Sequence, residues 1–360
     1  MKELLSELIA YRTVSGNHDE TAKLFVRIQK EFSKIGWQEE IFESNGFENR
    51  YYSPNGSKTP TVLFTAHIDV VAAPEELFSM RVEGGRYYGR GVLDMKFAAA
   101  QFIELAQELG ASADIGVLFT SDEEIGGFNG TRHILDTTDL KPEIVFLPDG
   151  GYDWLIEEKA KGVMWFEISA HGESSHASRP WEGDSAIETL VAYLYQMRRL
   201  FSDLDERSTY YHTTVNIGKI EGGESANSVA AHATAKLDIR YIPEDDPIEI
   251  TNRLEKLAKT FDGKVSVKEV ISGKHRVADL THPYISKFIE IAGSHGMEVG
   301  KTFSHGSSDA RYYFEKNIPV LMISPHGAGH HTDHEWISIS SLETFCEVVK
   351  DWTQSIATKA

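Results

Sequence analysis

The chain has 360 residues, which is long for a single compact domain and favours two domains. Its formal net charge is -19, with 55 acidic residues against 36 Lys and Arg. A protein this acidic repels nucleic-acid phosphates and anionic membrane surfaces, so neither is an expected partner.

Cysteine usage and hydropathy exclude further classes. The single cysteine, Cys346, cannot form an intrachain disulfide, and it lies in an apolar helical run where we expect it to pack. No segment has the roughly 18 consecutive apolar residues of a membrane span. The N-terminus carries early acidic residues and helical periodicity, without the layout of a signal peptide. We therefore expect a cytoplasmic protein.

The first part of the chain alternates helices with buried strands. Apolar spacing of three and four predicts amphipathic helices over residues 2–12 and 18–35. Short apolar, β-rich runs predict buried strands at 61–66, 115–120, 143–147 and, much later, 319–324. Helical patterns at 95–109 and 130–136 lie between them. This alternation predicts an α/β domain with a mixed, largely parallel sheet flanked by helices.

The pattern changes near residue 160. Longer strands are predicted at 162–170, 212–220, 229–242 and 264–271, with helices at 183–201 and 247–261 between them. This order predicts a small α+β sandwich with an antiparallel sheet. The earlier pattern then returns, with helices at 282–295, 308–316 and 338–356 and strands at 298–303 and 319–324. We predict an α/β domain in two pieces, 1–160 and 276–360, around an inserted domain at 161–275.

Polar clusters follow the most apolar strands of the predicted α/β domain. They comprise His67 and Asp69, the pair Glu123-Glu124, Asp149 and His331, and Asp94 precedes the helix at 95–109. The carboxyl ends of parallel strands open on one crevice, so we expect these side chains to converge.

Two imidazoles with several carboxylates are typical ligands of a divalent metal of the zinc class. A single catalytic ion usually takes three protein ligands, so this set fits two ions about 3.5–4 Å apart that share a carboxylate and a water. Zinc is the first expectation, and cobalt or manganese would satisfy the same ligands.

Two further residues complete the predicted site. Asp69, two residues after His67, is placed to accept the second N–H of a metal-bound imidazole. Of the neighbours Glu123 and Glu124, one can bind metal while the other acts as a general base. Each residue alone also has an ordinary interpretation, since Asp94 can cap a helix and Asp149 can form a turn before two glycines. Their shared position at strand ends favours the functional interpretation.

The stretches that carry these residues resemble a known family. They are TAHIDVV (65–71), GRGVLDMKFAAA (89–100), TSDEEIGG (120–127), PDGG (148–151) and GHHTDHEWI (329–337). In the same order, they are similar to motifs of the co-catalytic zinc peptidases and deacylases. That family includes aminoacylase, acetylornithine deacetylase, succinyl-diaminopimelate desuccinylase, peptidase T and carnosine dipeptidase. The resemblance extends over essentially the whole chain.

The resemblance implies a role for each matched position. His67 and Asp149 would bind one metal, Glu124 and His331 the other, and Asp94 would bridge both. Glu123 would be the general base that activates a metal-bridging water, with Asp69 behind His67. The family's His, followed four residues later by Glu, selects His331 with Glu335, although a shift to His330 or His334 stays open. The family also tends to have a cis peptide after the bridging Asp, here Asp94-Met95.

The inserted domain and one later loop match as well. HGESSHASRP (171–180) resembles a lid motif in which His176 would reach the active site of a partner subunit and stabilise the oxyanion. The lid would then also serve as the dimerisation domain of a homodimer. The family's substrate contacts correspond to Asn227, Arg240, Ser307, Ser308 and Arg311. Ordinary alternatives are a turn for Asn227 and a strand salt bridge for Arg240.

The expected function is cleavage of an amide bond in a short peptide, as by a dipeptidase or aminopeptidase. Many deacylases and carboxypeptidases of the family carry Glu where this chain has Asp149, which favours a peptidase. An N-acyl amino acid deacylase is the alternative, because the length and single small lid fit it equally well. A non-catalytic binding homologue is disfavoured by the complete ligand set, and a nucleotide enzyme by the lack of G-x-G-x-x-G or P-loop motifs.

Overall fold

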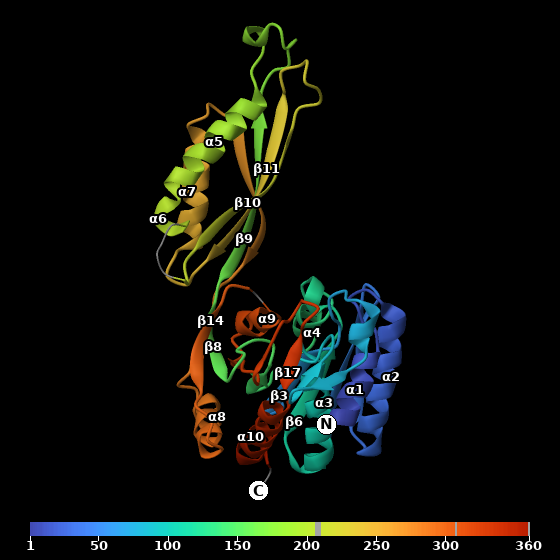
Figure 1. Cartoon of the computed structure of the whole chain (residues 1–360). Coiled ribbons are helices and arrows are strands. Elements are labelled where there is room, and N and C mark those ends of the chain that lie inside the picture. Colours follow the sequence, from blue (N-terminus) through green and yellow to red (C-terminus); the bar gives the residue numbers. More distant parts are fainter. Residues whose placement is uncertain (206–209, 307, 359–360) are drawn as a thin grey trace. The chain divides into compact units, whose positions relative to one another are not determined.

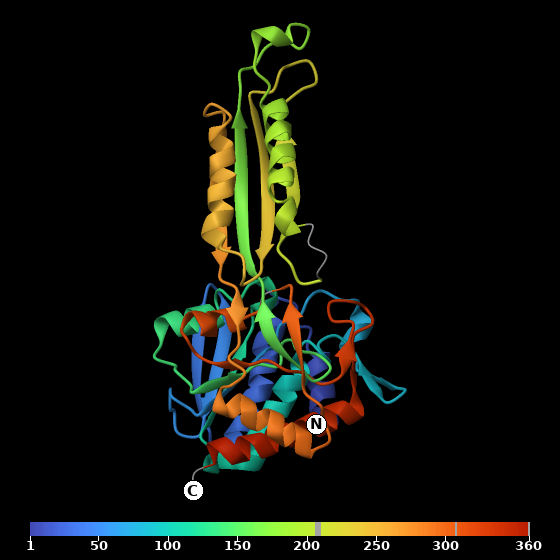
Figure 2. The same cartoon turned by 90° about the vertical axis from the view of Figure 1, so that its left-hand side faces the viewer.

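The structure is a computed structural model that describes residues 1–205, 210–306 and 308–358. The chain divides into two compact units. The first comprises Met1–Glu158, Ala278–Thr302 and Ser308–Ala360, and the second comprises Lys159–Val277 and Phe303–Ser307. Figures 1 and 2 show the elements of each unit from two sides. None of the helices in the described residues is long and apolar enough to cross a bilayer.

The main sheet of the first unit has, in the described residues, the strand order β1-β2-β6-β3-β7-β15. The strands are β1 (Gln38–Ser44), β2 (Phe47–Ser53), β3 (Val62–His67), β6 (Ile115–Thr120), β7 (Ile144–Phe146) and β15 (Val320–Leu321). β6, β3, β7 and β15 pair in parallel, whereas β2 joins β6 and β1 joins β2 in antiparallel fashion. The parallel strands are buried along their length, which requires cover on both faces. The predicted mixed, largely parallel sheet is confirmed.

Helices cover both faces of this sheet. They are α1 (Lys2–Ala10), α2 (His18–Lys34), α3 (Lys96–Leu109), α4 (Thr131–Thr137), α8 (Pro283–Ser294), α9 (Ala310–Glu315) and α10 (Ile339–Ala357). Successive strand residues point to opposite faces. Phe64 of β3 accordingly contacts Phe102 of α3 and Trp352 of α10, whereas the hydroxyl of Thr65 meets Tyr313 of α9. The core therefore extends over both faces of the sheet, and buried residues of α2, α4 and α9 belong to it together with those of α3, α8 and α10.

Two smaller sheets occur besides the main sheet. In the described residues one has the order β16-β17-β5-β4 and the other β13-β8-β14. Their strands are β4 (Arg81–Glu83), β5 (Arg86–Tyr88), β16 (Gly327–Ala328), β17 (Trp336–Ser338), β8 (Leu155–Ala160), β13 (Arg276–Val277) and β14 (Gly300–Ser304). The pairing of Trp336 with Tyr88 places the segment after β5 beside the segment before β17. Short 3-10 turns occur at Glu75–Phe78, Gly110–Ser112, Glu123–Ile125 (η3) and Pro180–Glu182.

The second unit is an antiparallel sheet with helices on one face. Its strands β9 (Gly162–His171), β10 (Thr214–Gly222), β11 (His232–Tyr241) and β12 (Val265–Gly273) have the order β10-β11-β9-β12 in the described residues. Helices α5 (Ala186–Leu200) and α7 (Pro247–Lys259) pack against the sheet, and the short α6 (Ser202–Asp205) follows α5. Alternation along β9 buries Phe166 and Ile168 in this core and leaves Trp165 exposed on the other face. The predicted α+β class of the insert is confirmed.

Local sequence explains where several helices begin. The side chains of Asn17, Ser185, Asp246 and Ser338 accept backbone N–H groups at the starts of α2, α5, α7 and α10. Such caps satisfy N–H groups that lack an intrahelical partner. α7 also has Pro247 in its first turn, where a missing N–H costs nothing.

Candidate active site

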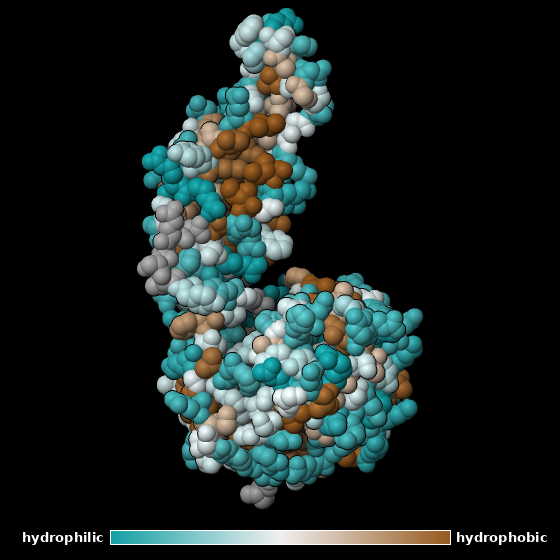
Figure 3. All heavy atoms as spheres, viewed as in Figure 1, coloured by the Kyte–Doolittle hydropathy of each residue, from teal (hydrophilic) through white to brown (hydrophobic). Residues whose placement is uncertain are grey.

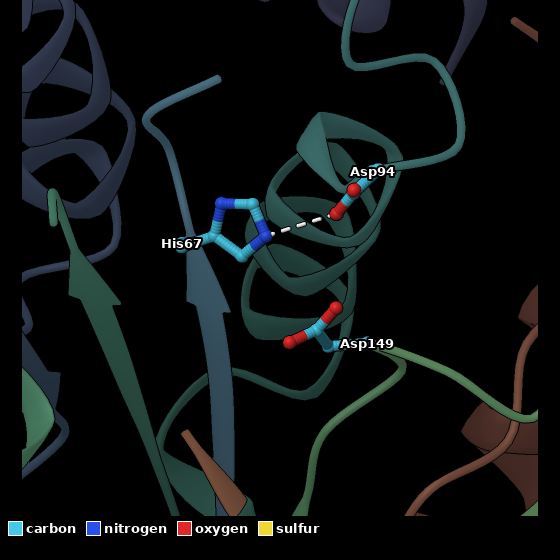
Figure 4. Close-up of side chains that lie close together, drawn as sticks. All are labelled: His67, Asp94 and Asp149. Carbon is cyan, nitrogen blue, oxygen red and sulfur yellow. Dashed lines mark hydrogen bonds and ion pairs between the residues drawn. The ribbon is translucent and has the colours of Figure 1, made fainter. Parts of the chain in front are cut away.

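The polar residues predicted to converge come from the ends of neighbouring strands. His67 is the last residue of β3, and Glu123 and Glu124 lie in η3 directly after β6. Asp149 follows β7, and Asp94 directly precedes α3 across a cis peptide bond to Met95. Figure 4 shows His67, Asp94 and Asp149 pointing toward a common space at this edge of the sheet. The cis peptide expected after Asp94 is confirmed.

The first group of ligand atoms is built from His67, Asp94 and Asp149. Their atoms lie within 4.8 Å of one another, and His67 Nε2 is 3.0 Å from Asp94 Oδ1. Oδ2 of Asp149 is buried and has no hydrogen-bond partner within the described part of the chain. A buried carboxylate oxygen without a donor indicates that a cation belongs beside it.

The second group is built from Asp94, Glu124 and His331. His331 Nε2 lies 3.1 Å from Asp94 Oδ2 and 2.9 Å from Glu124 Oε2. Asp94 therefore contributes one oxygen to each group, which is the arrangement of a carboxylate shared by two ions. Among the described residues these are the groups able to hold a metal ion.

The pKa values of three predicted ligands, His67, Asp149 and His331, are raised, which shows that the site favours bound protons or other positive charge. Burial favours the neutral form of Asp149 and, together with the nearby Asp94 carboxylate, raises the pKa of Asp149 to about 7. Hydrogen bonds that His331 donates to the Asp94 and Glu124 carboxylates raise the pKa of His331 to about 10. Burial by itself lowers the pKa of His67, but the Asp69 and Asp94 carboxylates outweigh it and raise that pKa well above the usual value. The residues present thus fit one or more divalent cations.

Asp69 connects the first group to the Glu123-Glu124 turn. The main-chain carbonyl of Asp69 lies 2.9 Å from His67 Nδ1, whereas its carboxylate oxygen Oδ1 is 3.6 Å from the same nitrogen. The carboxylate accepts the backbone N–H groups of Glu123 and Glu124, each at 3.2 Å, and the Ser15 hydroxyl at 2.7 Å. Asp69 therefore orients the imidazole mainly through its backbone and holds the η3 turn through its side chain.

Glu123 differs from Glu124 in its surroundings. Glu124 contacts His331, while Glu123 belongs to neither group of ligand atoms. Burial, followed by the negative charge of Asp149, raises the pKa of Glu123 well above its usual value. A carboxylate with a raised pKa beside a metal site has the properties of a general base.

Comparison with known proteins gives the family. Residues 63–355 match peptidase family M20/M25/M40. The chain belongs to this family. It is accordingly a metal-dependent hydrolase, and the resemblance noted in the sequence is confirmed.

Individual relatives of the family differ in their reactions. A probable carboxypeptidase of Aspergillus terreus is 30% identical over 335 residues, which cover 86% of this chain and 73% of the relative. The succinyl-diaminopimelate desuccinylase of Halorhodospira halophila is 25% identical, with coverage of 99% and 98%. A tripeptidase structure from Staphylococcus aureus has a TM-score of 0.79 at 21% identity, covering 99% of this chain and 97% of that one. That structure supports the fold.

Other sequence-predicted residues of this M20-type chain lie in the second unit. His176 is exposed, and its Nδ1 lies 2.8 Å from the Ser178 hydroxyl. The backbone carbonyl of Asn227 accepts the N–H of Ala177 at 3.0 Å, so Asn227 lies beside the motif that carries His176. Arg240 forms a two-pronged ion pair with Asp238 at 2.7 and 3.0 Å, which is the salt bridge considered as its ordinary alternative.

The loop after β14 lies in the first unit from Ser308 onward. Arg311 Nη2 donates to the Gly126 carbonyl at 2.7 Å and thereby supports the turn that carries Glu123 and Glu124. The Ser308 hydroxyl lies 4.0 Å from the Met322 sulfur. Ser307, also predicted to contact substrate, lies outside the described residues.

Several polar residues around the predicted ligands were not predicted from the sequence. Ser15 and Arg90 contact Asp69 and Glu335, and Asp309 is buried with its Oδ2 accepting the Thr131 hydroxyl at 2.5 Å. For these contacts the sequence offered one indication, the position of Glu335 four residues after His331, and it did not indicate what Glu335 does. The partners are as many as 245 positions apart, so no local pattern could have joined them.

Proposed function

We propose that this chain is a dinuclear metal-dependent hydrolase that cleaves an amide bond of a short peptide. The observation that carries the proposal is the shared Asp94 carboxylate, with His67 and Asp149 on one side and Glu124 and His331 on the other. These five residues would hold the ions, with zinc as the first candidate. Bound there, two cations would polarise the scissile carbonyl and make a water acidic enough to ionise near neutral pH.

The remaining chemistry is assigned to residues of this chain. Glu123 accepts the proton of the attacking water and later delivers it to the leaving nitrogen. Asp69 holds the N–H groups of Glu123 and Glu124 and so keeps the base beside the ligands. The buried surroundings of Glu123 suit this role, because they make its carboxylate a stronger base than an exposed one.

The inserted unit is proposed as a lid and dimerisation domain, with His176 acting in the active site of a partner subunit. Two features of this unit support an interface. Ile187, Val191 and Tyr195 are exposed at successive turns of α5, and β10 is an edge strand. Figure 3 shows apolar residues gathered over this part of the second unit. An apolar helix face beside an open strand edge fits a second copy of the same surface.

A peptide substrate is favoured over an N-acyl amino acid by Asp149, since its shorter carboxylate matches the peptidase members that the sequence resembles. N-acyl amino acid deacylation is the second candidate, because the desuccinylase relative aligns over 99% of this chain. The remote alternative of a non-catalytic homologue predicts no turnover at all.

The decisive experiment measures amine release from a matched panel with added zinc, cobalt or manganese. The panel compares free dipeptides and tripeptides with N-acetyl and N-succinyl amino acids. We expect release from free peptides in the wild type and its loss in Glu123→Gln. Release from blocked substrates alone would replace the peptidase proposal with the deacylase. Two bound metals without release from any member of the panel would mean that the substrate lies outside the panel.

A further inference from the structure

Glu335 is a buried carboxylate that touches neither predicted group of ligand atoms. Its side chain is 1% exposed, and all its described contacts are to the segment that leads to Asp94. Oε1 accepts the backbone N–H groups of Leu93 at 2.9 Å and Asp94 at 3.1 Å. Oε2 accepts the N–H of Gly91 at 3.0 Å and Arg90 Nη1 at 2.7 Å.

These hydrogen bonds take the place of the backbone hydrogen bonds that a helix or strand would provide. The segment from Arg90 to Asp94 lies between β5 and α3 and belongs to no strand or helix. Buried backbone N–H groups must find an acceptor, and here one carboxylate satisfies three of them. Hydrogen bonds to an ionised oxygen are about twice as strong as neutral ones. The backbone position of Asp94 therefore depends on Glu335.

The ion pair between Arg90 and Glu335 also contacts the loop that carries His331. Arg90 Nη2 donates to the carbonyl of Thr332 at 3.1 Å, and Thr332 directly follows His331. His331 itself has a positive φ of 61°, a conformation that persists in a non-glycine residue only where its surroundings hold it. Arg90 thus links the carbonyl next to His331 to the carboxylate that holds Asp94.

We propose that Glu335, with Arg90, is a positioning residue that fixes Asp94 and His331 relative to each other and thereby sets metal affinity. The inference rests on the proposed function, because it takes Asp94 and His331 as ligands. A ligand site tolerates displacements of only about 0.5 Å. Asp94 contributes to both groups, so a shift of its backbone disturbs both.

The test is the variant Glu335→Gln, which keeps the size of the side chain. A carboxamide has one acceptor oxygen, so its NH2 group faces N–H donors that need an acceptor. We expect the affinity for Zn²⁺, measured by competition with a chromophoric chelator, to fall about 10- to 100-fold. The visible spectrum of the Co²⁺-loaded protein should also change, because the ligand geometry changes.

Glu39→Gln is the matched control. Glu39 lies in the same unit and accepts Arg50 at 2.8 Å and the Tyr52 hydroxyl at 2.7 Å, apart from the predicted ligands. It should lower the melting temperature and leave Zn²⁺ affinity and the Co²⁺ spectrum unchanged. If Glu335→Gln does not fold, Arg90→Lys replaces it, because the single ammonium of a lysine lacks the two separate nitrogens by which Arg90 reaches Glu335 and Thr332.

The outcomes separate the inference from the proposed function. If the folded Glu335 or Arg90 variant binds Zn²⁺ as tightly as the wild type with the same Co²⁺ spectrum, the positioning role is wrong. Asp94→Asn is measured in parallel. If Asp94→Asn also binds metal like the wild type, the proposed ligand set itself has failed. A loss in Asp94→Asn and Glu335→Gln but not in Glu39→Gln supports both.

Discussion

Glu123 and Glu124 are neighbours of identical chemistry whose surroundings differ. Glu124 is 2.9 Å from His331, whereas Glu123 is half-buried near Asp149 without being part of a ligand group. The sequence alone permits either residue to be ligand or base. The η3 turn, held by Asp69, directs the two side chains apart and so favours one assignment.

The matched substitutions Glu123→Gln and Glu124→Gln test this assignment. For Glu123→Gln we expect kcat to fall about 10²- to 10⁴-fold while the bound metal content stays at the wild-type level, because a general base is lost. For Glu124→Gln we expect weaker metal binding, because an amide is a poorer ligand than a carboxylate. Metal content by atomic emission and kcat on the best peptide are the measurements. Weakened metal binding in Glu123→Gln with normal content in Glu124→Gln would reverse the two roles.

The packing of helix α10 determines the environment of Cys346 and the pKa of its thiol. The helix packs Phe345 and Trp352 against Phe146 of β7, and Cys346 is partly buried beside this contact. Burial of the thiol, followed by the negative charge of Glu104, raises the pKa of Cys346 to about 12. The packing role expected for Cys346 agrees with a thiol that stays protonated at neutral pH.

We therefore predict that native Cys346 resists iodoacetamide at pH 8. Only the thiolate reacts, so alkylation should be at least about 10³-fold slower than in the guanidinium-unfolded chain at the same pH. Mass spectrometry over time measures both rates. The same shift affects stability, because between about pH 9 and pH 12 the Cys346 thiol keeps its proton in the folded state and loses it in the unfolded state. The free energy of unfolding therefore decreases as the pH rises through this range. Equal rates in both states would contradict the buried thiol.

At the scale of elements, the sequence predicted the long helices and most of the buried strands, but it missed β1, β2 and β8, which are six or seven residues long. Ile115–Thr120 and Gly162–His171 carry clear apolar runs or alternation, and capping side chains mark several helix starts. The strands β5, β16 and β17 escaped because each has two or three residues, too few for a period. These short strands nevertheless bring Glu335 to the segment before Asp94.

At the scale of the whole molecule, the inserted unit is proposed to join two copies of the chain in a homodimer. The exposed face of α5 and, in the described residues, the outer position of β10 in its sheet are properties of one chain, and a second copy is proposed to cover them. If His176 acts in trans, each active site takes Glu123 from one subunit and His176 from the other.

Mixing two inactive variants tests this arrangement. Glu123→Gln and His176→Ala subunits, unfolded and refolded together in equal amounts, should recover about a quarter of wild-type activity. Half of the dimers would be mixed, and each mixed dimer would have one site with both residues intact. Each variant refolded alone is the control. If the mixture stays inactive while light scattering reports dimers, His176 acts within its own subunit or outside the mechanism.

The sequence by itself determined the two structural classes, the order of the main elements and the set of polar residues at strand ends. These features follow from local periodicity and from the rule that parallel strands open on one edge. Only the tertiary structure decided that the Asp69 side chain holds the turn of Glu123 and that Glu335 holds the backbone of Asp94. Those contacts join residues from 54 to 241 positions apart, and their geometry depends on packing rather than on any local pattern.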